Sequence, residues 1–528
     1  YWERGHLDAL LDRHPSVHRS FFDGEPRAVL TLQEAAVAIE RDVPFLPRAT
    51  GLGFHGRVEE LQAVVGEVET GAKPFIVLHG PGGVGKTRLM FETGSALADR
   101  GWQVLWANKE TMTTGRWYEG IVAERPTVLL VDEPENEQLL RQLVEQVGIG
   151  RVGDWRVIVN VRSPKDPVLK FLGKPGQQRS TAFIEVRPLA PEAAESFAQE
   201  LIDSSPSLSS LPAARRQSAA KRLARDFDRF PVWISLAVDL LESNGDLAKL
   251  PDSVEALADA YLDEIYSQQA GFPPETIETL LRWVALLETT NSEDDNELDL
   301  LRQVVDLPGI AELQRALGAL VSRKVVARRG ARDRLLEVKP DVMRDHVLRR
   351  WLLVWSEFGE PGWLPTADAK VLMDALVKAV VEGTLSQRHR RVLRSIARCE
   401  AGLLQSERSE VPLLPLLVDG FTACLTSLPA SKRVSLAEIL VPIAPLRPLL
   451  VLDLCDRMKE DACDEEVVET LLGPRSVTND DVVLELSWLV FHAAMGARDS
   501  NERTRVVRSL ASLVEAEHGI RDRRDRWP

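Results

Sequence analysis

The chain has 528 residues, of which 44% are hydrophobic and 27% are charged. This composition is ordinary for a folded globular protein, and the length corresponds to about three or four domains. The net charge of −15 argues against a general affinity for nucleic acid, because neutralising phosphates requires a basic surface. No apolar run reaches the ~18 residues of a membrane span, so we expect no membrane partner.

The cysteines and the first residue indicate the setting of the chain. The four cysteines form no CxxC pair and lie in helix-like segments, which favours free thiols in a reducing, cytoplasmic environment. The chain opens on Tyr1 rather than on an initiating methionine, so we expect it to be part of a longer protein, with an effector domain preceding Tyr1. Residues 1–48 carry short amphipathic patterns broken by prolines and predict a helical linker.

A glycine-rich motif is the most informative feature of the chain. Residues 80–87 read Gly-Pro-Gly-Gly-Val-Gly-Lys-Thr, directly after the apolar run 75–78 and before a helix that opens at Thr87. Glycines let successive backbone N–H groups curl around phosphates, and a helix N-terminus adds orphan donors and a positive dipole end. Most glycine-rich turns are only turns, but the Lys-Thr pair after the last glycine is typical of a phosphate-binding loop.

The motif therefore predicts that the protein binds a nucleoside triphosphate with Mg²⁺. Lys86 would reach the β- and γ-phosphates, and the Thr87 hydroxyl would hold the metal. The predicted cofactor-binding residues of the loop are Gly80, Pro81, Gly82, Gly83, Val84, Gly85, Lys86, Thr87 and Arg88.

Two acids follow a second buried strand. Residues 127–133 read Thr-Val-Leu-Leu-Val-Asp-Glu. In isolation this pattern is a strand that ends in solvated carboxylates, but about 45 residues after a phosphate-binding loop it favours catalysis. We assign Asp132 to the Mg²⁺ shell and Glu133 to the attacking water, which makes both acids, with Lys86, the candidate catalytic residues.

Apolar runs and helical patterns alternate through the region around these motifs. Strands are predicted at 75–79, 103–107, 127–132, 155–161 and 183–186, with a helix at 58–69 before the first of them. Strands that alternate with helices form a doubly wound parallel sheet, so residues 49–190 are predicted to be an α/β P-loop NTPase domain with a five-stranded parallel sheet. Residues 191–270 predict a helical lid domain with a break at Phe230-Pro231.

The remainder of the chain changes character twice. Residues 271–352 carry helical patterns at 276–287, 298–305 and 310–324, followed by a hairpin pattern at 325–338, and so predict a winged-helix domain. Residues 353–528 have apolar stripes of helical period broken every ~15–25 residues, which predicts a solenoid-like, α-helical C-terminal array.

This order of motifs resembles the STAND class of signal-transducing ATPases, which includes the NB-ARC and NACHT proteins of innate immunity and many bacterial antiviral defence proteins. The resemblance covers roughly residues 50–350. It implies that Phe54, Gly56 and Arg57 match the box that closes over the adenine, and that Asn160 and Arg162 match the sensor strand that feels the γ-phosphate. It also implies that Pro231 packs on the adenine, although the family's glycine two residues earlier is Arg229 here.

The chain departs from the family at one nucleotide contact. NB-ARC proteins carry a Met-His-Asp motif just after the winged-helix strand, where this chain reads Lys339-Pro340-Asp341-Val342, with Met343-Arg344-Asp345-His346 behind it. Either His346 takes over the contact with the ADP phosphate, or the contact is absent, and a lone helical histidine is more often structural. For Arg162 two readings also stand: a residue in the ligand crevice, or a partner of a carboxylate.

Three functions compete at this level. The first is a nucleotide-gated ATPase switch that ADP holds closed, and that exchanges ADP for ATP and forms a homo-oligomer when a protein trigger binds the C-terminal array. The second is an AAA-type ATPase whose winged helix acts on DNA as an initiator or loader, and the third is a transcription regulator. The basic run around the wing, Arg328, Arg329 and Arg332, could contact phosphates or help to lock the nucleotide domain. The switch accounts for more of the chain, particularly for its long C-terminal helical segment.

Overall fold

The computed structural model describes residues 29–42, 52–70, 73–107, 126–132, 155–162, 181–267, 271–329, 334–357, 362–406, 412–425, 428–440, 443–444 and 447–464, and scattered positions from 486 to 509. The chain divides into two compact units. The first unit comprises Tyr1–Val284 and Thr289–Arg344, and the second comprises Ala285–Glu288 and Asp345–Pro528.

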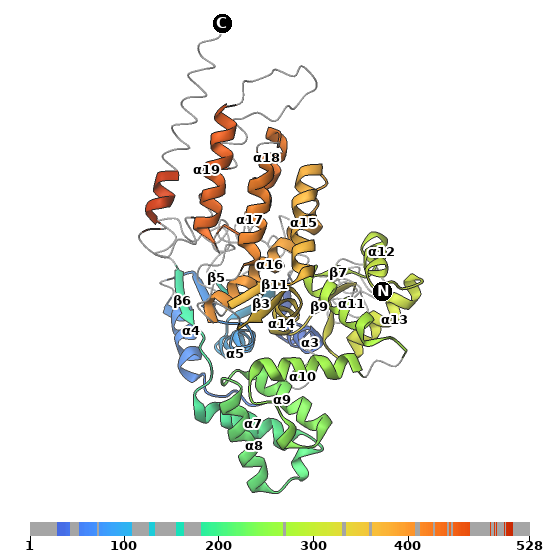
Figure 1. The fold of residues 1–528 in the computed structure, drawn as a ribbon. Helices are drawn as coiled ribbons and strands as arrows, with labels where there is room; N and C mark the ends of the chain where they lie inside the picture. Colours follow the sequence, from blue (N-terminus) through green and yellow to red (C-terminus); the bar gives the residue numbers. More distant parts are fainter. Residues whose placement is uncertain are drawn as a thin grey trace, which may run out of the picture. The chain divides into compact units, whose positions relative to one another are not determined.

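A six-stranded sheet organises the first unit (Figure 1). The strand order is β1-β3-β4-β5-β2-β6, and the strands from β2 to β6 pair in parallel, as predicted. Their bounds are β1 Val29–Thr31, β2 Phe75–His79, β3 Gln103–Ala107, β4 Thr127–Val131, β5 Trp155–Val161 and β6 Thr181–Glu185. Because β5 lies between β2 and β4, the ends of all three strands meet at one edge of the sheet.

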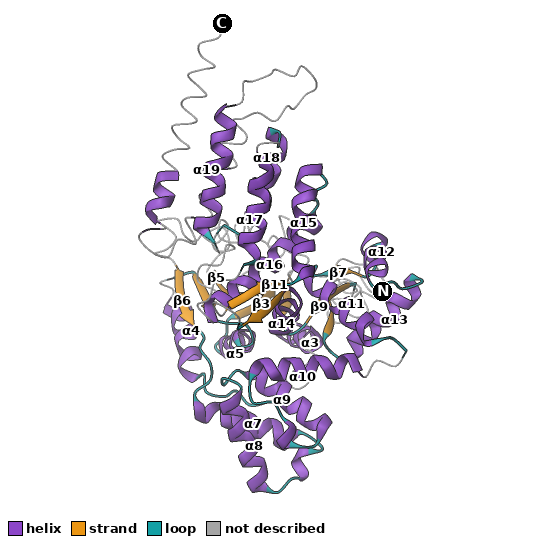
Figure 2. Ribbon diagram, in the orientation of Figure 1, coloured by secondary structure: helices purple, strands orange, loops and turns teal. Residues whose placement is uncertain are grey.

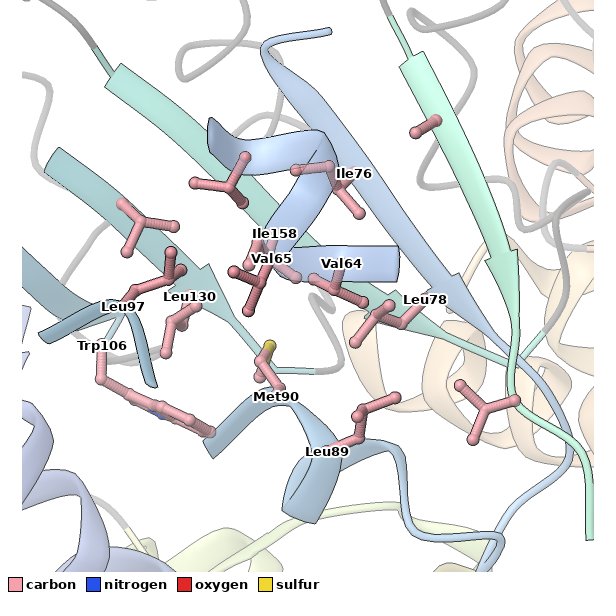
Figure 3. Packing of buried hydrophobic residues seen from close by; sticks show 14 of the residues in the cluster. Val64, Val65, Ile76, Leu78, Leu89, Met90, Leu97, Trp106, Leu130 and Ile158 are labelled. Carbon is pink, nitrogen blue, oxygen red and sulfur yellow. The ribbon is translucent and has the colours of Figure 1, made fainter. Parts of the chain in front are cut away.

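The core of this unit is made by the strands and by the helices α4 (Val58–Thr70) and α5 (Lys86–Asp99). Strands covered on both faces need continuous apolar runs, and β4 is buried at every position. Figure 3 shows how side chains from both helices meet the sheet. The labelled residues are Val64, Val65, Ile76, Leu78, Leu89, Met90, Leu97, Trp106, Leu130 and Ile158.

The N-terminal segment differs from the prediction. Residues 1–48 were expected to be a helical linker, yet β1 joins the sheet as an antiparallel edge strand on β3, and the helix α3 (Leu32–Asp42) follows at once. A reciprocal cap explains the sharp change from strand to helix. The Glu34 amide N–H donates to Thr31 Oγ1 at 3.3 Å, and the Thr31 N–H donates to Glu34 Oε2 at 2.8 Å. A strand of three residues is too short to stand out as an alternating pattern.

Four long helices follow the sheet: α7 Pro191–Ser204, α8 Ala213–Asp226, α9 Pro231–Asn244 and α10 Val254–Ser267. The break expected at Phe230-Pro231 is the start of α9, with the proline in the first turn, where its missing N–H costs nothing. We call residues 191–267 the helical region.

The next segment holds three helices and a small antiparallel sheet, and we call residues 274–338 the hairpin module. Its elements are α11 Pro274–Leu286, β7 Thr290–Asn291, α12 Asp295–Val304, α13 Ile310–Ser322, β8 Val326–Arg329 and β9 Leu335–Val338. The strand order is β7-β9-β8, so the predicted hairpin is present, and a two-residue strand that the sequence did not indicate joins it. The helix α14 (Asp341–Leu352) begins just behind β9.

The second unit is mainly helical, as predicted (Figure 2). Its helices are α15 Ala367–Glu382, α16 Gln387–Ser406, α17 Leu413–Cys424, α18 Ala430–Leu440 and α19 Pro448–Asp464. The two-stranded hairpin of β10 (Leu353–Ser356) and β11 (Gly362–Pro365) was not predicted. Trp355 and Trp363 face each other across it with ring centroids 5.3 Å apart, a tertiary contact that a helical reading of this apolar stretch missed. None of the helices in the described ranges is long and apolar enough to cross a membrane.

Candidate nucleotide-binding site

The glycine-rich loop has the geometry that its sequence predicts. β2 ends at His79, and α5 begins at Lys86, with Gly85 at its N-cap at a φ of 103° and no side-chain cap. Helix N-termini of this kind present N–H donors and a positive dipole end, both of which favour an anion. Gly83 is also left-handed, with a φ of 75°, a conformation that glycine adopts without strain.

Lys86 lies across the loop that precedes it. Its side chain is buried, and Nζ donates hydrogen bonds to the carbonyl oxygens of Gly80 at 2.9 Å and Pro81 at 3.0 Å. These two carbonyls hold the ammonium group at the loop, where it would pair with phosphate oxygens. The structure thus places Lys86 against the loop, and its contact with phosphate stays a prediction.

Three polar side chains meet where the strands end. Thr87 Oγ1 donates to Asp132 Oδ1 at 3.0 Å, and Asn160 Nδ2 donates to the same oxygen. The strand register explains the meeting, because Asn160 of β5 pairs with Leu78 at the end of β2, and Asp132 directly follows β4 on the other side of β5. Sequence reasoning named all three residues and predicted that Thr87 and Asp132 share a metal.

This trio fits Mg²⁺. A hydroxyl and a carboxylate oxygen 3.0 Å apart are the hard donors that Mg²⁺ prefers, and phosphates and water complete its shell in nucleotide sites. Among the described residues no group of three or more His, Cys, Asp or Glu side chains could hold a metal without a ligand. A metal that depends on one carboxylate, one hydroxyl and a nucleotide is consistent with both observations.

A hydrogen bond from Arg57 connects the Phe54–Arg57 box to the phosphate-binding loop. Arg57 is buried, and its Nη2 donates to the carbonyl oxygens of Val84 at 2.5 Å and Arg187 at 2.8 Å. Burial lowers the pKa of Arg57, against the opposing charge of Glu60. Phe54 packs at the edge of the main core. The structure therefore brings the predicted box to the loop, where Arg57 braces the backbone through its hydrogen bonds.

The same box contacts helix α7 through residues that the sequence did not single out. His55 Nε2 lies 2.5 Å from Glu200 Oε2, and the Gly53 N–H donates to the other oxygen of Glu200 at 2.8 Å. Burial opposes ionisation of this carboxyl, but the hydrogen bonds from His55 and Gly53 lower the pKa of Glu200. A Cβ on Gly56 would come 2.2 Å from Ala193 Cβ, so only glycine allows this approach. No local pattern marks Glu200, because its partners lie more than a hundred residues away in sequence.

Residues from two later parts of the first unit close over the loop. A Cβ on Gly83 would lie 2.1 Å from Val232 Cγ1, near the start of α9, and a Cβ on Gly82 would lie 2.9 Å from Val342 Cγ1, near the start of α14. Pro231, which the resemblance places on the adenine, lies beside Gly85, with its Cγ 3.9 Å from the Cβ position of that glycine. The helical region and the start of α14 therefore meet at the phosphate-binding loop.

Arg162 joins the strand end to α14. Its Nη2 donates to Asp341 Oδ2 at 2.9 Å, and its guanidinium carbon lies 3.9 Å from the Cβ position of Gly82. Both readings of Arg162 left open by the sequence therefore have support, since it borders the loop and pairs with a carboxylate. Asp341 also accepts from Lys339 Nζ at 2.8 Å, and Lys339 lies 3.3 Å from Glu337. A chain of alternating charges thus runs from β9 to the loop.

The remaining predicted residues have separate outcomes. Arg88 pairs with Glu92 at 2.6 Å and donates to the Leu52 carbonyl at 3.0 Å, so its charge is engaged by these two partners. Glu133 lies outside the described residues, and its catalytic role stays a prediction. His346 belongs to the second unit, where its Nδ1 lies 2.9 Å from Nη2 of Arg349, and its nucleotide contact also stays a prediction.

Comparison with known proteins gives one domain-level result. Residues 53–214 match the family model described as an AAA ATPase domain. No curated protein matches the chain. With the loop geometry described above, the family match makes this region a P-loop ATPase domain.

The solved structures that match part of the chain have low identity to it. A Walker-type ATPase of Pyrococcus abyssi is 13% identical, with a TM-score of 0.29 over 56% of this chain and 96% of that one. A RuvB mutant of Thermotoga maritima is 14% identical, with a TM-score of 0.30 over 60% and 95%. The ORC1 protein of Aeropyrum pernix, in complex with DNA, is 13% identical, with a TM-score of 0.27 over 58% and 95%. Scores this low carry no argument about the function of this chain.

Proposed function

We propose that this protein is a nucleotide-gated, signal-transducing ATPase switch of the STAND type. ADP holds it closed as a monomer, and a protein trigger at the C-terminal helices permits exchange for ATP and assembly into a homo-oligomer. Output would pass to an effector, as the STAND resemblance implies. The bacterial defence role that the STAND resemblance implies belongs to the same proposal.

One observation carries this proposal: the phosphate-binding loop is covered from outside its own domain. Val232 of the helical region and Val342 of α14 approach Gly83 and Gly82 so closely that neither glycine could bear a side chain without displacing them. Binding the phosphates of a nucleotide needs only the loop and α5. The helical region and the start of α14 also contact this loop. These contacts support the proposal that the positions of both segments depend on which nucleotide is bound.

The ion pair between Arg162 and Asp341 would respond differently to ATP and to ADP. Arg162 borders the loop, so a γ-phosphate would compete with Asp341 for its guanidinium group, whereas ADP brings no group of that charge to the same place. A ligand moves a two-state equilibrium only through its different affinity for the two states, and such a competition would provide that difference. ATP would thus favour release of α14 from the loop.

The chemistry of hydrolysis uses the polar trio. Mg²⁺, when bound with the nucleotide, neutralises charge that develops on the phosphates. Thr87 and Asp132 would hold the metal, Asn160 orients Asp132 through its amide, and Lys86 pairs with the phosphate oxygens. Glu133 would position the water. We expect hydrolysis to be slow and to reset the switch.

The Asp341→Asn variant tests the proposal, because it keeps the shape of the side chain and removes the charge that holds Arg162. We expect labelled ADP to leave about 10-fold faster, a change equal to ~1.4 kcal/mol. Light scattering should then find an assembled form with ATP in the variant and a monomer with ADP in the parent. Lys86→Ala serves as the variant that binds no nucleotide.

A matched control is Asp299→Asn in α12, which removes a carboxylate that pairs with Arg302 at 3.0 Å on the surface. It should behave as the parent, because exposed ion pairs contribute little. Equal ADP release by Asp341→Asn and by the control, with one and the same mass in ADP, in ATP and without nucleotide, would rule the switch out.

The match to an AAA ATPase domain favours a second candidate, an ATPase that acts on DNA through a winged helix formed by the hairpin module. Arg328 of β8 is exposed and would reach phosphates in that case. Duplex binding that weakens steeply with salt, and that is lost in Arg328→Ala, would support this candidate or a transcription regulator. The net charge of −15 favours the switch.

A further inference from the structure

The N-terminal segment Val29–Asp42, which we call the strap, is built into the nucleotide-binding sheet. β1 pairs antiparallel with β3 at Val29 with Ala107, Leu30 with Trp106 and Thr31 with Leu105. Leu30 and Ala35 are buried in the same core cluster as the strands. The strap lies before residues 53–214, the region that matches the AAA ATPase domain.

Helix α5 has a glycine, Gly94, where it packs against the strap. Gly94 lies in the middle of α5, where glycine costs about 1 kcal/mol relative to alanine. A Cβ at this position would come 3.1 Å from Leu32 Cδ1 of the strap and 2.9 Å from Leu130 Cδ1 of the sheet. Gly94 thus makes room for Leu32 between α5 and the sheet. Strand pairing, two buried side chains and this fit hold the strap to the nucleotide-binding domain.

Helix α3 of the strap has a second neighbour. Besides α5 and β3, it lies against β8 of the hairpin module. Val326 and Ala327 of β8 are buried. The contact between α3 and β8 therefore joins the nucleotide-binding domain to the hairpin module at a place other than the phosphate-binding loop.

We infer that α3 is a second latch of the closed state, acting on β8 and independent of the Arg162–Asp341 ion pair. This inference rests on the proposed switch. If the hairpin module moves together with α14 when α14 leaves the loop on activation, the strap cannot keep both of its contacts. The strap stays on β3 and α5, where Leu30 and Ala35 are buried and the ladder is intact, and β8 separates from α3.

The latch couples the N-terminal end of the chain to the nucleotide state. In the closed state α3 is covered by β8, and in the open state that side of the helix becomes accessible. A short capping turn joins β1 to α3 without a linker, so α3 directly follows the strand that is anchored in the sheet. Nucleotide exchange would then change whether this side of α3 is available for a contact.

The Val37→Pro variant tests the latch. Val37 is 66% exposed, so its replacement removes little packing, while proline breaks the helix beyond the first turn and leaves Leu32 and Ala35 in place. We expect amide hydrogen exchange in β8 to rise about 5-fold or more in the ADP form, and ADP release to accelerate about 10-fold. Exchange in α5 should not change.

Val37→Ala is the matched control, because alanine keeps the helix, and it should behave as the parent. Val37→Gly weakens the helix without breaking it and should change β8 exchange in the same direction by a smaller factor, which keeps the test valid if the proline variant fails to fold. Unchanged β8 exchange in both helix-weakening variants would overturn the inference.

The nucleotide measurement separates this inference from the proposed function. If Asp341→Asn accelerates ADP release and Val37→Pro and Val37→Gly do not, the second latch is absent and the switch stands. If none of these variants changes ADP release or assembly with ATP, the switch itself fails, and the latch fails with it.

Discussion

Asp132 and Glu400 are both carboxylates with well-defined partners, but the partners differ in charge. Asp132, at the end of β4, accepts hydrogen bonds from the Thr87 hydroxyl at 3.0 Å and from the Asn160 amide, which are neutral donors. Glu400, on α16 of the second unit, is fully buried, accepts from the Leu414 N–H at 2.8 Å and pairs with Arg447 at 2.7 Å. Neutral donors orient one carboxylate, whereas the other is buried beside a cation.

This difference separates a chemical role from an architectural one. Neutral donors fix the direction of a carboxylate and leave its charge for a cation, which is what a metal ligand requires. A charged partner satisfies the carboxylate within the protein and joins the elements that carry the two groups, here α16 and the segment leading into α19. Burial raises the pKa of Glu400 to about 7, against the opposing effects of the Leu414 N–H and Arg447.

The largest effect should come from the oriented acid. Asp132→Asn keeps the shape and removes the charge, so Mg²⁺ loses its carboxylate ligand. We expect ATP hydrolysis to fall about 1000-fold, equal to ~4 kcal/mol, because metal stabilisation of the transition state is worth several kcal/mol. The thermal midpoint should not fall, since no buried ion pair is broken. Single-turnover hydrolysis of labelled ATP and a melting curve measure the two quantities.

Asp99→Asn is the control for this prediction, because Asp99 is an exposed acid at the other end of α5. It should hydrolyse ATP as the parent does. Retention of parental turnover by Asp132→Asn at saturating Mg²⁺ would remove Asp132 from the metal site and would end the comparison with Glu400.

Glu400 should change how the stability of the second unit depends on pH. The pKa of Glu400 is raised from 4.5 to about 7 in the folded protein, so between these values the native state holds a proton that the unfolded state has lost. The free energy of unfolding of the second unit therefore falls as the pH rises through this window, by about 3 kcal/mol in total. Urea denaturation at a series of pH values, followed in the second unit, measures the slope.

Glu400→Gln removes this titration and keeps an acceptor for the Leu414 N–H. The slope between pH 4.5 and 7 should flatten in the variant, whatever its absolute stability. A parent whose second unit becomes more stable as the pH rises through this window would show that Arg447 holds Glu400 ionised, which is the opposite sign.

The sequence indicated the role of Asp132 but not that of Glu400, and the reason is physical. Asp132 follows a short apolar run and belongs to a motif with fixed spacing, so local pattern and chemistry agree. Glu400 reaches Arg447 over 47 residues, and Asp341 reaches Arg162 over 179 residues. Pairings of that range depend on how whole elements pack, and one sequence contains no periodicity that marks them.

The same limit applies to the fold. Parallel strands and long helices were predicted because each carries its own apolar pattern over five or more residues. β1 and β7, with three and two residues, depend on neighbours to become strands, and β10 and β11 depend on each other. The cover over the phosphate-binding loop, made by Val232 and Val342, was likewise outside the reach of local patterns.

The smallest expected effect concerns the backbone next to the site. Arg229, at the position where the STAND resemblance has glycine, is left-handed with a φ of 61°, and Lys324 at the end of α13 has a φ of 62°. A side chain in this conformation costs about 1 kcal/mol, and glycine removes much of that cost. Arg229→Gly and Lys324→Gly should each stabilise the first unit by up to about 1 kcal/mol, seen as a higher thermal midpoint.

Because the Arg229 side chain is exposed, ADP affinity should stay within about twofold of the parent, which isothermal titration can measure. A gain in stability from Lys324→Gly alone, with weaker ADP binding in Arg229→Gly, would instead place the Arg229 side chain among the groups that hold the nucleotide, and the strain would then belong to the site, as the charge of Asp132 does.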